Sequence, residues 1–107
     1  MRLPNGDRAD IGRKLEDYVL SPQHREGRHK ARVFESVLGV SLANRHVLTE
    51  AILRAAATSD DVLPRGDNDH GRVYALHFAM RTAKGTATVA TAWIVRRGED
   101  FPRLITC

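Results

Sequence analysis

The second half of the chain contains two alternating segments joined by a glycine turn. Over residues 72–81, large apolar side chains alternate with small or polar ones, which is the period of a β-strand with one buried face. Residues 83–85, Ala-Lys-Gly, are typical of a hairpin turn. Residues 86–96, rich in threonine and valine, are the expected return strand. These features predict an antiparallel hairpin at the centre of the fold.

The alternation also predicts which face of this hairpin is covered. Tyr74, Leu76, Phe78 and Met80 share one face, and we expect helices to cover it. The opposite face carries small and polar side chains, including His77. Such a face can stay open to solvent, so it is a candidate binding surface on a basic domain.

The first half of the chain has the spacing of helices instead. Apolar residues recur at intervals of three and four, which predicts helices over residues 11–20, 29–37 and 45–58. Gly39 is expected to end the second helix, and Asn44 to cap the third. The second helix should bury an apolar stripe made of Val33, Phe34, Val37 and Leu38.

Two shorter strands complete the predicted sheet. Val62 and Leu63 form an edge strand that Pro64 closes, and residues 103–106 form the last strand. We therefore predict one α+β domain of 107 residues. Its helical part, about residues 11–58, packs on one face of an antiparallel sheet of three to four strands over about residues 61–107. Trp93 and Phe34 are expected in the core between them.

Composition narrows the class of protein. The net charge of +4 favours an anionic partner. The single cysteine, Cys107, excludes an internal disulfide, and no His or Cys pair has the spacing of a zinc site. Common nucleotide-binding and zinc-hydrolase motifs are missing, so no cofactor is expected. Without a long apolar run or a signal-like segment, we expect a cytoplasmic protein that does not enter membranes.

Cations gather where the second helix is expected to begin, and they are Arg25, Arg28, Lys30 and Arg32. The start of a helix is the positive end of its dipole, so cations there are unfavourable unless a phosphate binds to the free N–H groups. Lys30 lies one turn before Phe34, at the edge of the buried stripe. The alternative is a lysine that lays its stem on the core, within an ordinary solvated loop.

Three histidines are candidates for proton transfer near neutral pH. His24 and His29 lie in the basic segment, and His77 lies in the middle of a strand on the open face. The last strand adds Arg103 and Thr106, which strict alternation places on opposite faces.

Two segments, HKARVFESVLGV at residues 29–40 and AWIVRRGEDFPRLITC at residues 92–107, carry a resemblance that covers nearly the whole chain. They resemble a bacterial family of small domains of unknown function with the patterns Gly-x-x-Lys-Ala-x-x-Phe and Trp-Ile-x-x-x-Gly-x-x-x-Pro-Arg-Leu-x-Thr. Such domains look like toxin modules, and their order of elements is similar to that of barnase, colicin and RelE-type ribonucleases, which is an analogy of fold. Among the matching positions, Lys30, Arg103 and Thr106 carry useful chemistry.

Our first functional hypothesis is a metal-independent endoribonuclease of a toxin–antitoxin pair, with RNA as substrate and a small acidic antitoxin or immunity protein as partner. The predicted catalytic residues are Lys30, His24, His29 and His77. The predicted phosphate-binding residues are Arg25, Arg28, Arg32, Arg103 and Thr106. The alternatives are a non-catalytic basic module that binds nucleic acid or an acidic protein, and a plain scaffold.

Overall fold

A computed structural model describes all residues of the chain, and it has the α+β fold predicted from the sequence. The helices are α1 (Gly27–Leu38) and α2 (His46–Thr58), with short helical turns η1 (Gly6–Arg8), η2 (Leu15–Val19) and η3 (Leu42–Asn44). The strands are β1 (Val62–Asp67), β2 (Gly71–Arg81), β3 (Thr86–Arg96) and β4 (Arg103–Thr106). They form one antiparallel sheet in the order β1-β2-β3-β4.

The central hairpin has the predicted alternation. Strands β2 and β3 pair without interruption from Gly71–Arg96 to Arg81–Thr86. On the inner face of β2, Tyr74, Leu76 and Met80 are buried and Phe78 is half-buried, whereas His77 on the outer face is exposed.

Trp93 lies at the centre of the core, as predicted, and is fully buried. Its indole N–H donates a hydrogen bond to the Thr91 hydroxyl at 2.8 Å, and that hydroxyl donates to the Leu76 carbonyl at 2.7 Å. A buried threonine is therefore paired on both sides, as buried polar groups must be.

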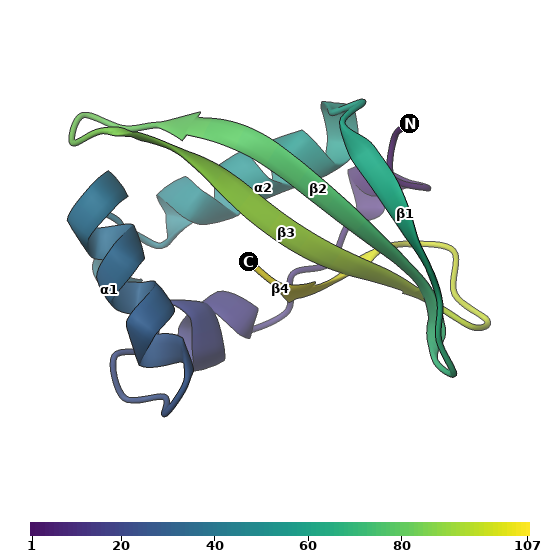
Figure 1. Cartoon of the computed structure of the whole chain (residues 1–107), viewed down its shortest axis with the longest axis horizontal. Coiled ribbons are helices and arrows are strands. Elements are labelled where there is room, and N and C mark those ends of the chain that lie inside the picture. The colour runs from purple at the N-terminus through teal and green to yellow at the C-terminus, as the bar shows by residue number, and fades with distance from the viewer.

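The two helices have different places in the molecule. Figure 1 shows α2 running behind the β2–β3 hairpin, and α1 at one end of the molecule below the hairpin's turn. That turn is fixed to the end of α1, because the Thr82 hydroxyl donates to the Leu38 carbonyl at 2.7 Å and Lys84 Nζ donates to the Glu35 carbonyl at 3.0 Å. Gly39, with φ +69°, ends α1 as expected. No helix has both the length and the apolar character required to span a membrane.

Three local predictions were wrong. The first expected helix is reduced to η2, because Gly12 adopts φ +53° before it and the Leu20 N–H closes a five-residue turn onto the Leu15 carbonyl. Asn44 does not cap α2. Its side chain accepts from the Ser41 N–H at 2.7 Å and so caps the η3 turn.

Strand β1 also differs, since it continues past Pro64 to Asp67. An edge strand tolerates proline when the missing N–H falls on its unpaired side.

The apolar stripe of α1 is only partly buried. Leu38 is buried and Phe34 half-buried against the core, but Val33 is 59% and Val37 40% exposed. Because α1 lies at the end of the molecule, it contacts η2 and β3 along a narrow edge. Two apolar side chains of the predicted stripe therefore face solvent.

Candidate functional site

Lys30, in the first turn of α1, is the best-positioned cation of the predicted site. Its Nζ donates a hydrogen bond to the Thr106 hydroxyl at 2.6 Å and lies 5.2 Å from the centre of the Tyr18 ring. No carboxylate lies within ion-pair distance of Nζ. The ammonium is held in place by two neutral groups, so its charge remains available to a ligand.

A close approach of two elements brings Lys30 and Tyr18 together. Leu15 and Val19 anchor η2 in the core, which leaves Tyr18 at its surface. Any side chain at Gly27 would collide with the Tyr18 carbonyl oxygen. Glycine at this position therefore lets the start of α1 pack directly on η2.

His24 closes the start of α1. Its Nδ1 accepts hydrogen bonds from the N–H groups of Glu26 at 3.1 Å and Gly27 at 3.0 Å, and its carbonyl accepts from the Arg28 N–H at 3.0 Å. The ring also packs edge-on against Tyr18, with centroids 4.6 Å apart. An Nδ1 that accepts hydrogen bonds carries no proton, so this arrangement places the ring N–H at Nε2.

This cap changes the explanation for the basic helix start. We expected free N–H groups there to attract a phosphate, but His24 occupies those of Gly27 and Arg28, and Glu26 accepts from His29. The backbone at this helix end does not need an anion. Any anion binding must come from the side chains.

Lys30, His24 and Thr106 line one pocket of about 540 Å³. The full lining is Arg13, Lys14, Asp17, Tyr18, His24, Lys30, Ile105 and Thr106. Arg13 is paired with Asp17 at 3.2 Å, whereas Lys14 has no carboxylate partner. We call this the Lys30 pocket. It is a small positively charged hollow, also lined by two residues with hydroxyl groups, Tyr18 and Thr106, and by the imidazole of His24.

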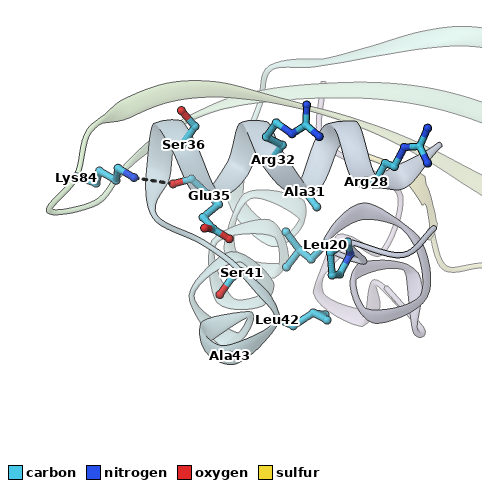
Figure 2. Close-up of a pocket in the computed structure, with 11 residues that line it drawn as sticks. Leu20, Arg28, Ala31, Arg32, Glu35, Ser36, Ser41, Leu42, Ala43 and Lys84 are labelled. Carbon is cyan, nitrogen blue, oxygen red and sulfur yellow. Dashed lines mark hydrogen bonds between the residues drawn. The ribbon is translucent and has the colours of Figure 1, made fainter. Parts of the chain in front are cut away.

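The other predicted residues lie elsewhere. His29 is exposed on α1 and His77 is exposed on the outer face of β2, and neither lines the Lys30 pocket. Arg25 is exposed in the loop before α1. Arg28 and Arg32 line a separate pocket of about 480 Å³. Figure 2 shows their guanidinium groups side by side along α1.

Arg103 is occupied by carboxylates. It makes two hydrogen bonds of 2.9 Å to Glu99 and one of 3.2 Å to Asp10, and it stacks on Phe101 at 4.9 Å. The hydrogen bonds from Arg103 lower the pKa of the Glu99 carboxyl. Asp10 also bridges β4 through its backbone, accepting from the Leu104 N–H at 2.9 Å. Arg103 therefore connects the N-terminal segment to β4.

A register shift separates Arg103 from Thr106. Arg103 lies opposite Ile94 and Thr106 opposite Ala92, with a slip of one residue between them. Strict alternation therefore does not apply along β4. The Thr106 side chain is directed to Lys30, and Arg103 to Glu99.

The sequence analysis did not single out five residues that line the Lys30 pocket, namely Arg13, Lys14, Asp17, Tyr18 and Ile105. Tyr18 was one apolar position in a helix, and Lys14 was an ordinary surface lysine; neither carries a signal by itself.

The pocket also adjoins Cys107. Burial raises the pKa of its thiol to about 11, and the positive charge of Lys30 opposes this rise. No three His, Cys, Asp or Glu side chains converge in the way that would hold a metal ion.

The sequence also matches a family model. Residues 2–107 match the family described as "Domain of unknown function (DUF6883)". This chain belongs to that family, which confirms the resemblance to a family of domains of unknown function. No curated protein and no solved structure matches it.

Proposed function

We propose that this domain is a toxin-like, metal-independent endoribonuclease that receives an RNA phosphodiester in the Lys30 pocket. The observation that carries the proposal is the Lys30 ammonium, which Thr106 and Tyr18 hold in place and no carboxylate neutralises. A preorganised cation of this kind stabilises charge that develops during a reaction.

The chemistry would use the RNA 2′-OH as the internal nucleophile. Its oxygen gives up its proton and attacks the adjacent phosphorus, the bond from phosphorus to the 5′-oxygen breaks, the leaving 5′-oxygen takes a proton from water, and a 2′,3′-cyclic phosphate remains. Lys30 would stabilise the charge on the non-bridging oxygens, and the Nε2–H of His24 would donate to the same phosphate. Asp17 is the carboxylate of the pocket, and in this proposal it accepts the proton of the 2′-OH.

The test is cleavage of a labelled RNA pool by the purified domain in EDTA. We expect fragments that end in 2′,3′-cyclic phosphate, and no cleavage of the same sequences made as DNA. Induced expression should also arrest growth. A pure domain that neither cleaves RNA nor arrests growth would overturn the proposal.

A second candidate is a non-catalytic module that binds a small acidic protein, and the outer face of α1 favours it. Val33 and Val37 are exposed on one side of α1, and Arg28 and Arg32, which have no carboxylate partner, lie on a different side of the same helix. A helix that carries both exposed apolar side chains and unpaired cations suits a partner with an acidic, partly apolar surface. The partner to test is the product of any short acidic open reading frame beside this gene. Val33→Asp should weaken that complex, while His46→Asp on α2 should leave it intact.

A further inference from the structure

The Lys30 pocket continues into a second hollow. This hollow has a volume of about 650 Å³ and shares Lys14 and Ile105 with the Lys30 pocket. Its lining includes Ile94 and Arg96 from β3 and His70 from the connection between β1 and β2. One groove therefore runs from Lys30 past β4 to the far end of β3. We call it the β4 groove.

Unpaired cations follow the whole length of the β4 groove. Those without a carboxylate within ion-pair distance are Lys14, Lys30, Arg96 and Arg97. The groove is also lined by Arg103, which Glu99 and Asp10 neutralise, and by two carboxylates, Asp17 and Asp69. Of these two, Asp17 is already paired with Arg13. The groove thus has an excess of positive charge that the protein itself does not neutralise.

The dimensions of the β4 groove fit several nucleotides. Thr106 lies opposite Ala92 on β3, and Arg96 follows four residues later along that strand. At about 3.3 Å per residue this is ~13 Å. A stacked single strand advances about 3.4 Å per nucleotide, so the groove spans about four nucleotides. Ile105, which is 37% exposed, offers apolar surface between the cations, against which a base can lie.

We propose that the β4 groove is the track for a single-stranded RNA, with Lys30 at the reacting phosphate and Lys14, Arg96 and Arg97 at flanking phosphates. This inference rests on the proposed function and extends it, because it assigns a substrate class longer than one phosphodiester. Contacts of this type attract the backbone without reading the bases.

Binding of a 12-nucleotide oligouridine to the full chain tests the track. The 2′-oxygens are methylated to prevent cleavage, and affinity is measured by fluorescence polarisation across salt concentrations. In Arg96→Gln/Arg97→Gln, the negative slope of log affinity against log salt should become shallower by about 1.4, since each phosphate contact of a single strand contributes about −0.7. The matched control is Arg54→Gln/Arg65→Gln, which removes two exposed, unpaired arginines outside the groove. It should keep the parental slope.

The outcomes separate the track from the catalytic proposal. Equal slopes in the two double variants would overturn the β4 groove, and cleavage in EDTA by the parent would then still support the proposed function. A shallower salt dependence of RNA binding in Arg96→Gln/Arg97→Gln alone would support the groove even if no RNA is cleaved. If polyglutamate of the same charge bound as tightly as the oligouridine and displaced it, the groove would not be an RNA track, and the result would point to an acidic protein.

Discussion

Lys30, on α1, contacts one end of β4, and Arg103 forms the other end. The two cations differ in whether carboxylates surround them. Arg103 begins β4 and is bound by Glu99 and Asp10. Lys30 contacts the last residue of β4, Thr106, through a hydroxyl, and its other neighbour is an aromatic ring. Both side chains are held in place, but only Arg103 is neutralised.

In our proposal, this difference separates a structural cation, Arg103, from a functional one, Lys30. A guanidinium that makes several hydrogen bonds to carboxylates uses its charge to hold segments of the chain together. An ammonium held by neutral groups is fixed in position while its charge still acts on a ligand. Two basic side chains that both contact β4 are thus left in different electrostatic states, and the neighbouring carboxylates decide which one is neutralised.

The largest expected effect is on Lys30. Lys30→Met keeps the apolar stem and removes the charge, so cleavage of RNA should fall by about 10²–10³-fold, as for the loss of one preorganised contact. The midpoint of thermal unfolding should stay close to that of the parent. Rates are measured under single-turnover conditions. Cleavage unchanged in this variant would remove Lys30 from the site and break the comparison.

Arg103→Met should give the opposite result. The free energy of unfolding should decrease, with the midpoint lowered by a few degrees, while the folded variant retains cleavage. The pH dependence provides a second measure. Because Arg103 lowers the pKa of Glu99 below 4.5, this pair stabilises the parent above that pH and the contribution is lost as the pH falls through the lowered pKa.

Urea unfolding of the parent and Arg103→Met at pH 7 and pH 3 measures this contribution. The parent should lose more stability than the variant between the two pH values. A variant as stable as the parent that no longer cleaves RNA would assign Arg103 to the site instead.

Variants of His24 test whether this residue acts in cleavage or only caps the start of α1. Loss of its cap in His24→Ala should destabilise the protein by about 1 kcal/mol, as for other helix caps. His24→Asn keeps an acceptor near the same N–H groups and should recover part of that loss. If His24→Asn restores stability but not cleavage, the Nε2–H of His24 takes part in the reaction beyond its role as a cap.

The effect that is smallest at neutral pH concerns Cys107, beside Lys30. Burial raises the pKa of its thiol from 9.0 to about 11, so the folded protein retains a proton that the unfolded chain has lost. Stability should therefore decrease as the pH rises from about 9 to about 11. Cys107→Ser should show a smaller decrease over that range in urea unfolding. Equal decreases would show that the thiol ionises freely in the folded protein.

The sheet and its covered face could be predicted from the sequence because alternation is a local property. Each residue of β2 reveals its side by its neighbours, and the hairpin turn sets the register with β3. The ends of the elements were harder, since Asn44 had two turns available to cap and Pro64 was acceptable only because β1 lies at the edge of the sheet. Val33 belonged to a correct helical stripe, but the pattern does not say how much of a helix its neighbours cover.

The sequence alone determined the α+β order of elements, the inner face of β2, the burial of Trp93 and the choice of Lys30 as a residue to examine. Only the tertiary structure decided that Thr106 and His24 meet Lys30, that Tyr18 joins them, and that Arg103 is engaged by Glu99. The reason is physical. Helical and strand periods follow from the geometry of adjacent residues, whereas the electrostatic state of a side chain depends on groups that the fold brings from distant positions.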